Sequence, residues 1–349
     1  MDALLTDAVK ALLTDQCTPA VVRAIEAGQS RAALWKALEA SGFADALVPE
    51  SEGGAGLALA DVYPVLELCG SFAVPLPLGE TLLARGLLAH AGVSAPKGSV
   101  VFGTGQLSSD GRLKCAQVRC GTQADWVLVS CGGLCRLLSA AEAHLEMAGF
   151  CLDAQMSWPQ TVWDVAQAVP GAHDLVSLQA ALYAAQLAGA LMTVFSRTLQ
   201  YANDRQQFGK PIGKFQAIQH QLSVMSEHAF AARMAAQLGL SAAGQVPDRL
   251  RVAMAKARTS EAALEVAGLS HAIHGAIGFT REFDLQLFTR RLHAWRQAAG
   301  SESYWHDVLG QALLDSTDPL SLDQIRTLTD TVVCFLIKKP HERFSPDHP

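Results

Sequence analysis

The stretch from Ala172 to Ala202 limits the possible folds more than any other part of the sequence, because Ala, Leu, Gln and Val fill it with few interruptions. Its apolar residues recur at helical spacing and predict one long helix. Ala-rich helices of this kind pack closely into bundles, often across a subunit interface. Four further helices are predicted in the same region, at Phe215 to Leu240, Arg249 to His271, Leu285 to Gln297 and Glu302 to Leu314.

The N-terminal part of the chain is also helical in pattern. Apolar residues three and four positions apart predict helices at Val21 to Ser41, Ala58 to Gly70 and Leu78 to His90. Between the first two helices, Val48 to Gly56 is rich in glycine and is expected to form a loop rather than a helix. Residues 1–96 are therefore predicted to be a helical domain.

Residues 97–168 differ, since short β-type runs replace the helical periodicity. Strands are expected at Val100 to Phe102, Trp126 to Val129 and Arg136 to Leu138, and Ser108 to Gly111 has the composition of a hairpin turn. The predicted order is thus a helical domain, a small β domain (97–168) and a helical bundle (169–315). The tail (316–349) is expected to contain one more helix, from Ser321 to Ile337.

Composition narrows the protein class. With 50% hydrophobic and 17% charged residues, the chain has ample material for a buried core. Its net charge of −6 is unfavourable for binding to nucleic acid. Met1 to Lys10 lacks a secretory signal pattern, and no uninterrupted apolar run has membrane-spanning length. We therefore expect a cytoplasmic protein without a membrane span, in which the eight cysteines are thiols.

Five of these cysteines lie close together in the β-type region. A zinc site would need a tight CxxC pair on each side, whereas these cysteines are further apart and lie in segments with the residue pattern of β-strands. We interpret them as small buried residues on strands, and no metal site is expected. They are Cys115, Cys120, Cys131, Cys135 and Cys151.

A first unusual segment runs from Tyr201 to Gln219, where one long helix ends and the next begins. Arg205 supplies a planar and permanently charged group suited to a pair of phosphates. Gln207 and Gln216 add neutral hydrogen-bonding groups, and Phe208 offers a ring face on which a purine can stack. A surface turn with an exposed arginine is the simpler alternative, but it leaves the combination unexplained.

A second segment, His274 to Asp284, places glycines at a predicted helix end, where the backbone can approach a ligand. Glu282 and Asp284 are interpreted as residues that begin the next helix. On its own this segment is a weak signal, because glycine at a helix C-terminus is common.

Together, the two segments resemble the acyl-CoA dehydrogenase family of flavoproteins. Arg205 to Gln219 matches the family pattern R-x-x-F-G-x-P-I-x-x-F-Q-x-I-Q, and His274 to Asp284 is similar to the segment H-G-G-x-G-F-T-x-E-x-D. The loop Val48 to Gly56 and the strand Ala124 to Val129 resemble further family segments. The likeness extends over about residues 20–314.

The resemblance implies an α+β multi-domain fold whose C-terminal four-helix bundle pairs subunits. It implies FAD at a subunit interface, where one chain holds the isoalloxazine and acyl chain against its β domain. The neighbour's Arg and Phe bind the pyrophosphate and adenine. A family Glu removes the α-proton of an acyl-CoA thioester, the β-hydrogen leaves to flavin as hydride, and electrons pass to an electron-transferring flavoprotein. The cofactor-binding residues implied here are Arg205, Gln207, Phe208, Phe215, Gln216, Ile218, Gly275, Ser301 and Ser303.

This sequence departs from the family pattern at the catalytic base. The usual base sits in a Glu-Gly-Thr-like triplet, and the matching residues are Ala299, Gly300 and Ser301. The alternative base position of some relatives corresponds to Gln179. Neither Ala299 nor Gln179 can accept a proton usefully, and loss of a general base typically costs about 10²–10⁴ in rate. No catalytic residue is therefore predicted in this chain.

Two further departures concern the flavin. The β-type region between Lys97 and Gln167 lacks the family's T-E-P-x-x-G-S-D loop, which packs against flavin and thioester. The residues that match a pyrophosphate-facing Gln and a second glycine are Ala272 and Ala276. The residues that match the family pattern are those that, in the family, bind a neighbouring subunit's flavin. The residues that depart from the pattern are those that, in the family, serve the chain's own flavin.

We therefore interpret the chain as the smaller, catalytically silent subunit of a heteromeric α2β2 acyl-CoA dehydrogenase, whose partner subunit carries the Glu. Relatives of this kind act on bulky substrates that include steroid side-chain CoA thioesters. Two alternatives remain open at this point. One is an active homomer with a relocated base such as Glu302, which fits better as a charge at a helix N-terminus. The other is a non-catalytic scaffold of the same fold, such as one that contacts nucleic acid, and the net charge counts against it.

Overall fold

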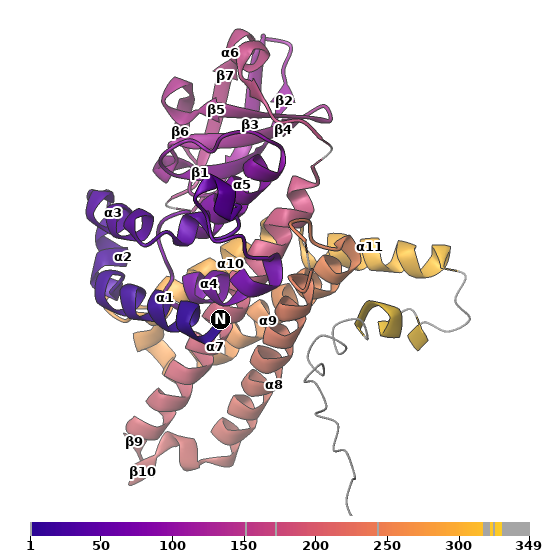
Figure 1. Ribbon diagram of the computed structural model, residues 1–349. Helices are drawn as coiled ribbons and strands as arrows, with labels where there is room; N and C mark the ends of the chain where they lie inside the picture. Colours follow the sequence, from indigo (N-terminus) through magenta and orange to yellow (C-terminus); the bar gives the residue numbers. More distant parts are fainter. Residues whose placement is uncertain are drawn as a thin grey trace, which may run out of the picture.

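The computed structural model describes residues 2–150, 152–171, 173–242, 244–316, 322–323 and 325–329. Short helices come first, a β region forms one end of the molecule, and long helices form the other (Figure 1). The predicted α+β multi-domain architecture is confirmed.

The N-terminal part consists of helices that pack beside the bundle. The predicted single helix from Val21 to Ser41 is wrong, because the chain turns at Gly28, whose φ is +90°. Gln29 N–H donates to the Ala24 carbonyl, which closes the helix end in the manner of a glycine C-cap, and a new helix follows. The α-helices are α1 (Asp2–Gln16), α2 (Pro19–Glu26), α3 (Ala32–Ala40), α4 (Leu59–Ser71) and α5 (Leu78–His90), with single 3-10 turns η1 (Phe43–Asp45) and η2 (Glu50–Glu52).

The β region is a pair of four-stranded sheets packed face to face. One sheet has the order β1-β4-β5-β8 and the other β2-β3-β7-β6. Alternate residues of both sheets, such as Val127, Leu113 and Trp158, meet in a shared core. The elements are β1 (Val100–Thr104), β2 (Gln106–Leu107), β3 (Arg112–Val118), η3 (Gly121–Gln123), β4 (Trp126–Cys131), β5 (Leu134–Ser139), η4 (Ala140–Glu142), β6 (His144–Met147), β7 (Ala154–Pro159), α6 (Gln160–Val165) and β8 (Gln167–Ala168).

The C-terminal part is built around one central helix, α7. It has the length and apolar composition to cross a membrane, but 83% of its most apolar window is buried inside the protein, as in a core helix. At the crossing with α4, Gly70 faces the Gln186 backbone and Gly189 faces the Glu67 backbone, so the two helices touch at close range. The elements are α7 (Leu175–Asp204), β9 (Gln206–Gln207), β10 (Lys210–Pro211), η5 (Ile212–Lys214), α8 (Gln216–Gly239), α9 (Arg249–His274), η6 (Gly275–Phe279), α10 (Leu285–Gln297) and α11 (Glu302–Asp315).

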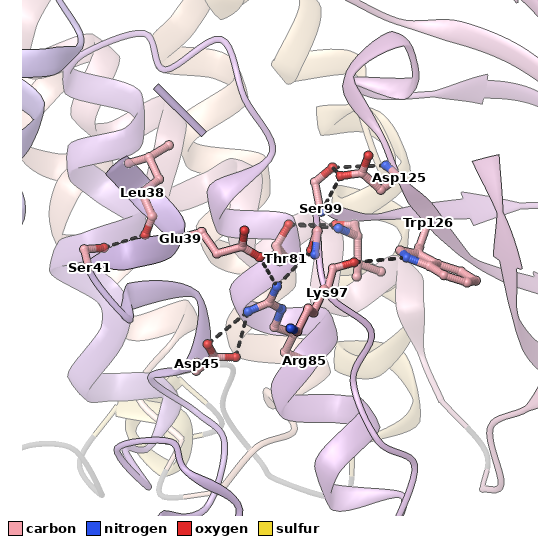
Figure 2. A network of polar contacts seen from close by, with 12 residues as sticks. Leu38, Glu39, Ser41, Asp45, Thr81, Arg85, Lys97, Ser99, Asp125 and Trp126 are labelled. Atoms are coloured by element: carbon pink, nitrogen blue, oxygen red, sulfur yellow. Dashed lines mark hydrogen bonds and ion pairs between the residues drawn. The ribbon is translucent and has the colours of Figure 1, made fainter. Parts of the chain in front are cut away.

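The N-terminal helices are fixed to the β region by buried polar contacts (Figure 2). The Arg85 guanidinium on α5 donates to Asp45, to Glu39 at 3.1 Å and to the Gly98 carbonyl at 2.9 Å. Thr81, one turn earlier, accepts a hydrogen bond from the Val100 amide, so the start of β1 is tied to α5. These contacts make the helical and β parts one continuous body.

Beyond α11 the structure describes only part of the tail. Residues 322–323 and 325–329 are helical and fall within the helix predicted from Ser321 to Ile337. The remainder of that predicted helix lies outside the described residues.

Candidate functional site

The first motif forms the far tip of the bundle, where α7 and α8 are joined (Figure 1). The β9 and β10 segments make a small antiparallel hairpin in which Gln207 pairs with Lys210. Phe208 and Gly209 form its two-residue turn, with φ values of +51° and +77°, the pattern of a tight hairpin turn. A left-handed Phe costs about 1–3 kcal/mol, and this conformation leaves the ring 91% exposed.

Arg205 lies immediately before this hairpin. Its backbone N–H donates to Tyr201 and its carbonyl accepts from Ile212 at 2.8 Å, so the main chain is fixed at both groups. The side chain is exposed, and within the described residues its guanidinium has no hydrogen-bond acceptor. The hydrogen-bonded main chain thus presents the exposed planar cation of Arg205 three residues before the exposed ring of Phe208.

The other predicted residues of the first motif surround Phe208. The Phe215 ring stands edge-on to Phe208 with centroids 6.1 Å apart, and the Lys210 ammonium lies 4.3 Å from the Phe215 centroid. Gln207 and Gln216 are exposed. Ile218 is half-buried against the bundle core, so the structure places it under the tip rather than on its surface.

The second motif lies beside the first. Its His274 ring stacks on Tyr201 at 4.3 Å, and the Tyr201 hydroxyl donates to the His274 carbonyl. Gly275 follows with a φ of +65° and is exposed. The two segments that carry the resemblance, about seventy residues apart in the sequence, are therefore joined through the side chain of Tyr201, which also meets the Phe283 ring edge-on. Asp284 begins α10 and pairs with Arg23 at 2.6 Å.

The position of the family base is a closed turn between α10 and α11. Ala299 adopts a φ of +53°, and the Trp305 indole N–H donates to its carbonyl at 2.9 Å. The Ser301 hydroxyl accepts from the Tyr304 amide and caps α11, so it serves the helix N-terminus. Ser303 is exposed on the first turn. Gln179, the second base position, is half-buried on α7.

Glu302 is held by neighbouring cations. Its carboxylate forms an ion pair with Arg296, and the fully buried Lys256 lies close by. The Lys256 ammonium donates to the carbonyls of Arg296 and Gly300 and to Ser260. Burial lowers the pKa of Lys256 to about 7, while the nearby Glu302 opposes that shift. Glu302 is thus a helix-start residue that balances buried positive charge, which is a poor setting for a proton acceptor.

A second region of interest is the junction between the β region, α5 and the bundle, where the resemblance places the chain's own flavin. Arg119, just after β3, donates to Asp153 and to the Ala294 carbonyl at 2.8 Å. The Tyr183 hydroxyl on α7 donates to Glu80 on α5 at 3.4 Å. Burial raises the pKa of Glu80 to about 7, with Tyr183 acting in the opposite direction.

This junction is filled by side chains. Phe150 lies over the guanidinium of Arg291, which in turn pairs with Glu26 at 2.6 Å. The remaining cavity has a volume of about 20 Å³, whereas pockets for small-molecule ligands have volumes of roughly 300–1,000 Å³. The residues present therefore do not fit an isoalloxazine ring at this position. The cavity is lined by Val74, Leu76, Glu80, Arg119, Cys120, Phe150, Leu152, Asp153, Gln186, Arg291 and Trp295.

The junction residues were not predicted from the sequence. Glu80 could have been noticed, because it is a single acid between Leu78 and Leu82 in a strongly apolar run. Arg119 and Asp153 carry no such signal, since their pairing depends on how β3 and β7 are brought together. A larger hollow of about 550 Å³ lies elsewhere, beside α6, and contains no residue of either motif.

The cysteines lie on the strands and turns of the β region. Cys115 and Cys135 are buried on β3 and β5, and Cys131 is half-buried on β4. Among the residues that the structure describes, no three His, Cys, Asp or Glu side chains are grouped as a metal site would need. Cys151 lies outside the described residues.

The helix–β–helix order, with an arginine and an aromatic ring exposed at the bundle tip, is the arrangement expected from the resemblance to a family of flavoprotein dehydrogenases. Comparison with known proteins agrees. Residues 174–314 match the family model of the acyl-CoA dehydrogenase C-terminal domain. Acyl-CoA dehydrogenase IpdE2 of Mycolicibacterium smegmatis is 31% identical over 313 residues, which cover 85% of this chain and 94% of that protein. The chain belongs to the acyl-CoA dehydrogenase family, as the motifs predicted.

Solved structures share the fold. The ChsE4-ChsE5 complex from Mycobacterium tuberculosis has a TM-score of 0.79 at 22% identity, with 91% of this chain and 98% of that chain covered. A variant of the Tcur3481-Tcur3483 steroid ACAD has a TM-score of 0.79 at 25% identity, with 90% and 98% covered. Membership of the family implies the use of FAD.

Proposed function

We propose that this chain is the base-lacking subunit of a heteromeric acyl-CoA dehydrogenase, and that it contributes Arg205 and Phe208 to an FAD held mainly by its partner subunit. The partner supplies the catalytic Glu and most of the acyl pocket. The reaction is the α,β-dehydrogenation of an acyl-CoA thioester, with electrons passing to an electron-transferring flavoprotein. We place the assembly in the cytoplasm as an α2β2 tetramer.

The observation that carries this proposal is the distance along α7 between the filled junction and the bundle tip. Tyr183 lies in the filled junction, and Arg205 lies 22 residues later, which corresponds to about 33 Å at 1.5 Å per residue. The tip therefore cannot serve a ligand at the junction of its own chain. Its exposed cation and ring are arranged for a ligand that another chain holds.

The base position supports the same assignment. Ala299 has no ionisable side chain, and Glu302 is paired with Arg296. Glu80 has a pKa near 7, which would suit a base, but it faces a cavity of about 20 Å³ that has no room for a thioester. Glu302 is thus occupied by a cation, and Glu80 has no access to substrate.

The solved relatives support a partner subunit and a substrate class. The ChsE4-ChsE5 complex and the Tcur3481-Tcur3483 steroid ACAD each pair two different proteins. By similarity to these relatives we extend the proposal to a bulky, steroid-derived acyl-CoA thioester as substrate.

In the proposed complex, each tip residue has a separate role. Arg205 would hold the pyrophosphate, because its guanidinium is a planar, permanently charged group that a lysine does not replace. Phe208 would hold the adenine with its exposed ring, and Gln207 and Gln216 would add neutral hydrogen-bonding groups. When bound, FAD supplies hydride acceptance. This chain binds and orients it, and no proton transfer is assigned to its residues.

Co-expression with a full-length acyl-CoA dehydrogenase encoded beside this chain tests the proposal. We expect a complex with one FAD per pair of chains, measured by flavin absorbance against protein mass. Arg205→Ala and Phe208→Ala should each lower FAD retention at least tenfold without dissociating the complex. Lys36→Ala, which removes an exposed cation on α3 outside both motifs, is the matched control.

The lone chain provides the opposing outcome. We expect it to purify without flavin and to leave acyl-CoA unoxidised. Stoichiometric FAD and turnover in a homo-oligomer of this chain would contradict the proposal.

A further inference from the structure

Gly268 lies within the C-terminal third of α9, on an exposed face, and nothing in the described structure accounts for a glycine there. A Cβ atom added at Gly268 would meet no atom within 4 Å. Its φ is not in the left-handed region, so the backbone does not require glycine either. Glycine inside a helix costs about 1 kcal/mol relative to alanine.

Five other glycines within α-helices have an evident cause. In each case an added Cβ would press on a neighbouring element of the same chain, as Gly239 would on Ala255 of α9. In this protein a helical glycine therefore marks a close approach of another element. These glycines are Gly70, Gly79, Gly86, Gly189 and Gly239. Gly310 of α11 is also open, but it is close in sequence to residues outside the described part of the chain.

Gly268 is the centre of an uncovered apolar stripe. Leu264, one turn before it, is 48% exposed, and Ala272, one turn after it, is also exposed. Residues at this spacing share one face of a helix. The stripe continues into Phe279, which is 71% exposed and is stacked on His271 with ring centroids 4.3 Å apart.

We infer that a helix of the partner acyl-CoA dehydrogenase subunit crosses α9 at Gly268. This inference rests on the proposed function. The stripe runs directly into the second motif, which begins at His274, so the surface that contacts the partner helix is continuous with the segment that faces the partner's flavin. One neighbouring subunit then covers both.

The charges at the edge of the stripe specify the partner further. Glu265 is exposed beside Leu264, and Glu261 lies one turn earlier on the same face. Glu261 is paired with Arg258 and with His306 at 3.0 Å, whereas Glu265 has no cation beside it in the described structure. The crossing helix is therefore expected to carry a small residue opposite Gly268 and a Lys or Arg opposite Glu265. A Lys or Arg of the partner at the edge of the stripe also favours fast association of the two subunits.

A bulky side chain at Gly268 tests the contact with the partner helix without disturbing the fold of the lone chain. In Gly268→Leu, the added side chain projects into open space in the lone chain, so its thermal midpoint should be unchanged or higher. The same side chain would occupy the space of the crossing helix, and we expect at least tenfold weaker association with the co-expressed partner, measured by analytical ultracentrifugation. Ala33→Leu, which adds the same side chain to an exposed face of α3, should leave association unchanged.

The outcomes distinguish this inference from the proposed function. Retained association of Gly268→Leu would overturn the crossing while leaving the heteromer intact. A lowered midpoint in the lone chain would mean that the chain's own residues cover Gly268. A homodimer of the lone chain that Gly268→Leu disrupts would make a second copy the occupant. Failure of the wild-type chain to associate with any partner would overturn the proposed function itself.

Discussion

Glu80→Gln tests whether the filled junction is as dry as its geometry indicates. Glu80 is 4% exposed, and burial raises its pKa from 4.5 to about 7. Between these two values the folded protein keeps the proton that the unfolded chain has lost, so the free energy of unfolding falls as pH rises from about 4.5 to 7. At about 1.4 kcal/mol per pH unit, the total reaches about 3 kcal/mol. Gln copies the protonated form and removes this loss.

We therefore expect Glu80→Gln to match the wild type at pH 4, below the pKa of Glu80 in the unfolded chain, and to be more stable by about 2–3 kcal/mol at pH 8, because the long Tyr183 contact offsets little of the gain. Urea unfolding at several pH values, followed by circular dichroism, measures the difference. Glu50→Gln, at an exposed position of the N-terminal loop, should show no such pH dependence. A variant that is less stable than the wild type at pH 8 would refute the reasoning and identify Glu80 as a usefully ionised group beside Arg119.

Three other predictions concern the same features. Arg119→Met should lower the free energy of unfolding, measured by chemical denaturation, by about 3–5 kcal/mol, since it leaves Asp153 buried without its cation. The control Lys36→Met, on the exposed face of α3, should change the free energy of unfolding by less than about 0.5 kcal/mol. Phe208→Gly should keep or raise stability by up to about 1 kcal/mol, because it relieves the left-handed Phe, yet it should lower FAD retention in the complex. Gly189→Ala should cost at least about 1–3 kcal/mol, because the new methyl group meets the Glu67 carbonyl, and an unchanged midpoint would show that α4 and α7 can separate.

The local pattern of apolar and polar residues was sufficient to predict much of the fold. Leu78 to His90 and Leu285 to Gln297 were predicted with the observed bounds, because apolar periodicity and polar ends coincide there. The break at Gly28 was missed, since its φ of +90° depends on a cap that periodicity does not reveal. The division of the β region into two sheets also lay beyond the sequence, because strand order is set by pairings that are distant along the chain.

For the site, the sequence identified groups whose residue types are unusual in an ordinary turn, and the structure places Arg205 and Phe208 exposed at one tip. Ile218 was also predicted as a cofactor-binding residue, although its side chain lies against the core of the bundle. The junction around Arg119 and Glu80 was not foreseen. Each of its members is an ordinary charged residue in the sequence, and only the meeting of three parts of the fold gives them a role.

The length of α7 has a consequence for how such a protein can change over time. In a symmetric ancestor, each binding place would combine the middle of one copy with the distant end of the other. Under the proposed function, substitutions after gene duplication that close the middle of one copy would abolish one FAD site but leave intact the helix end that completes the other. The two genes can then diverge without loss of activity, provided that both continue to be expressed together.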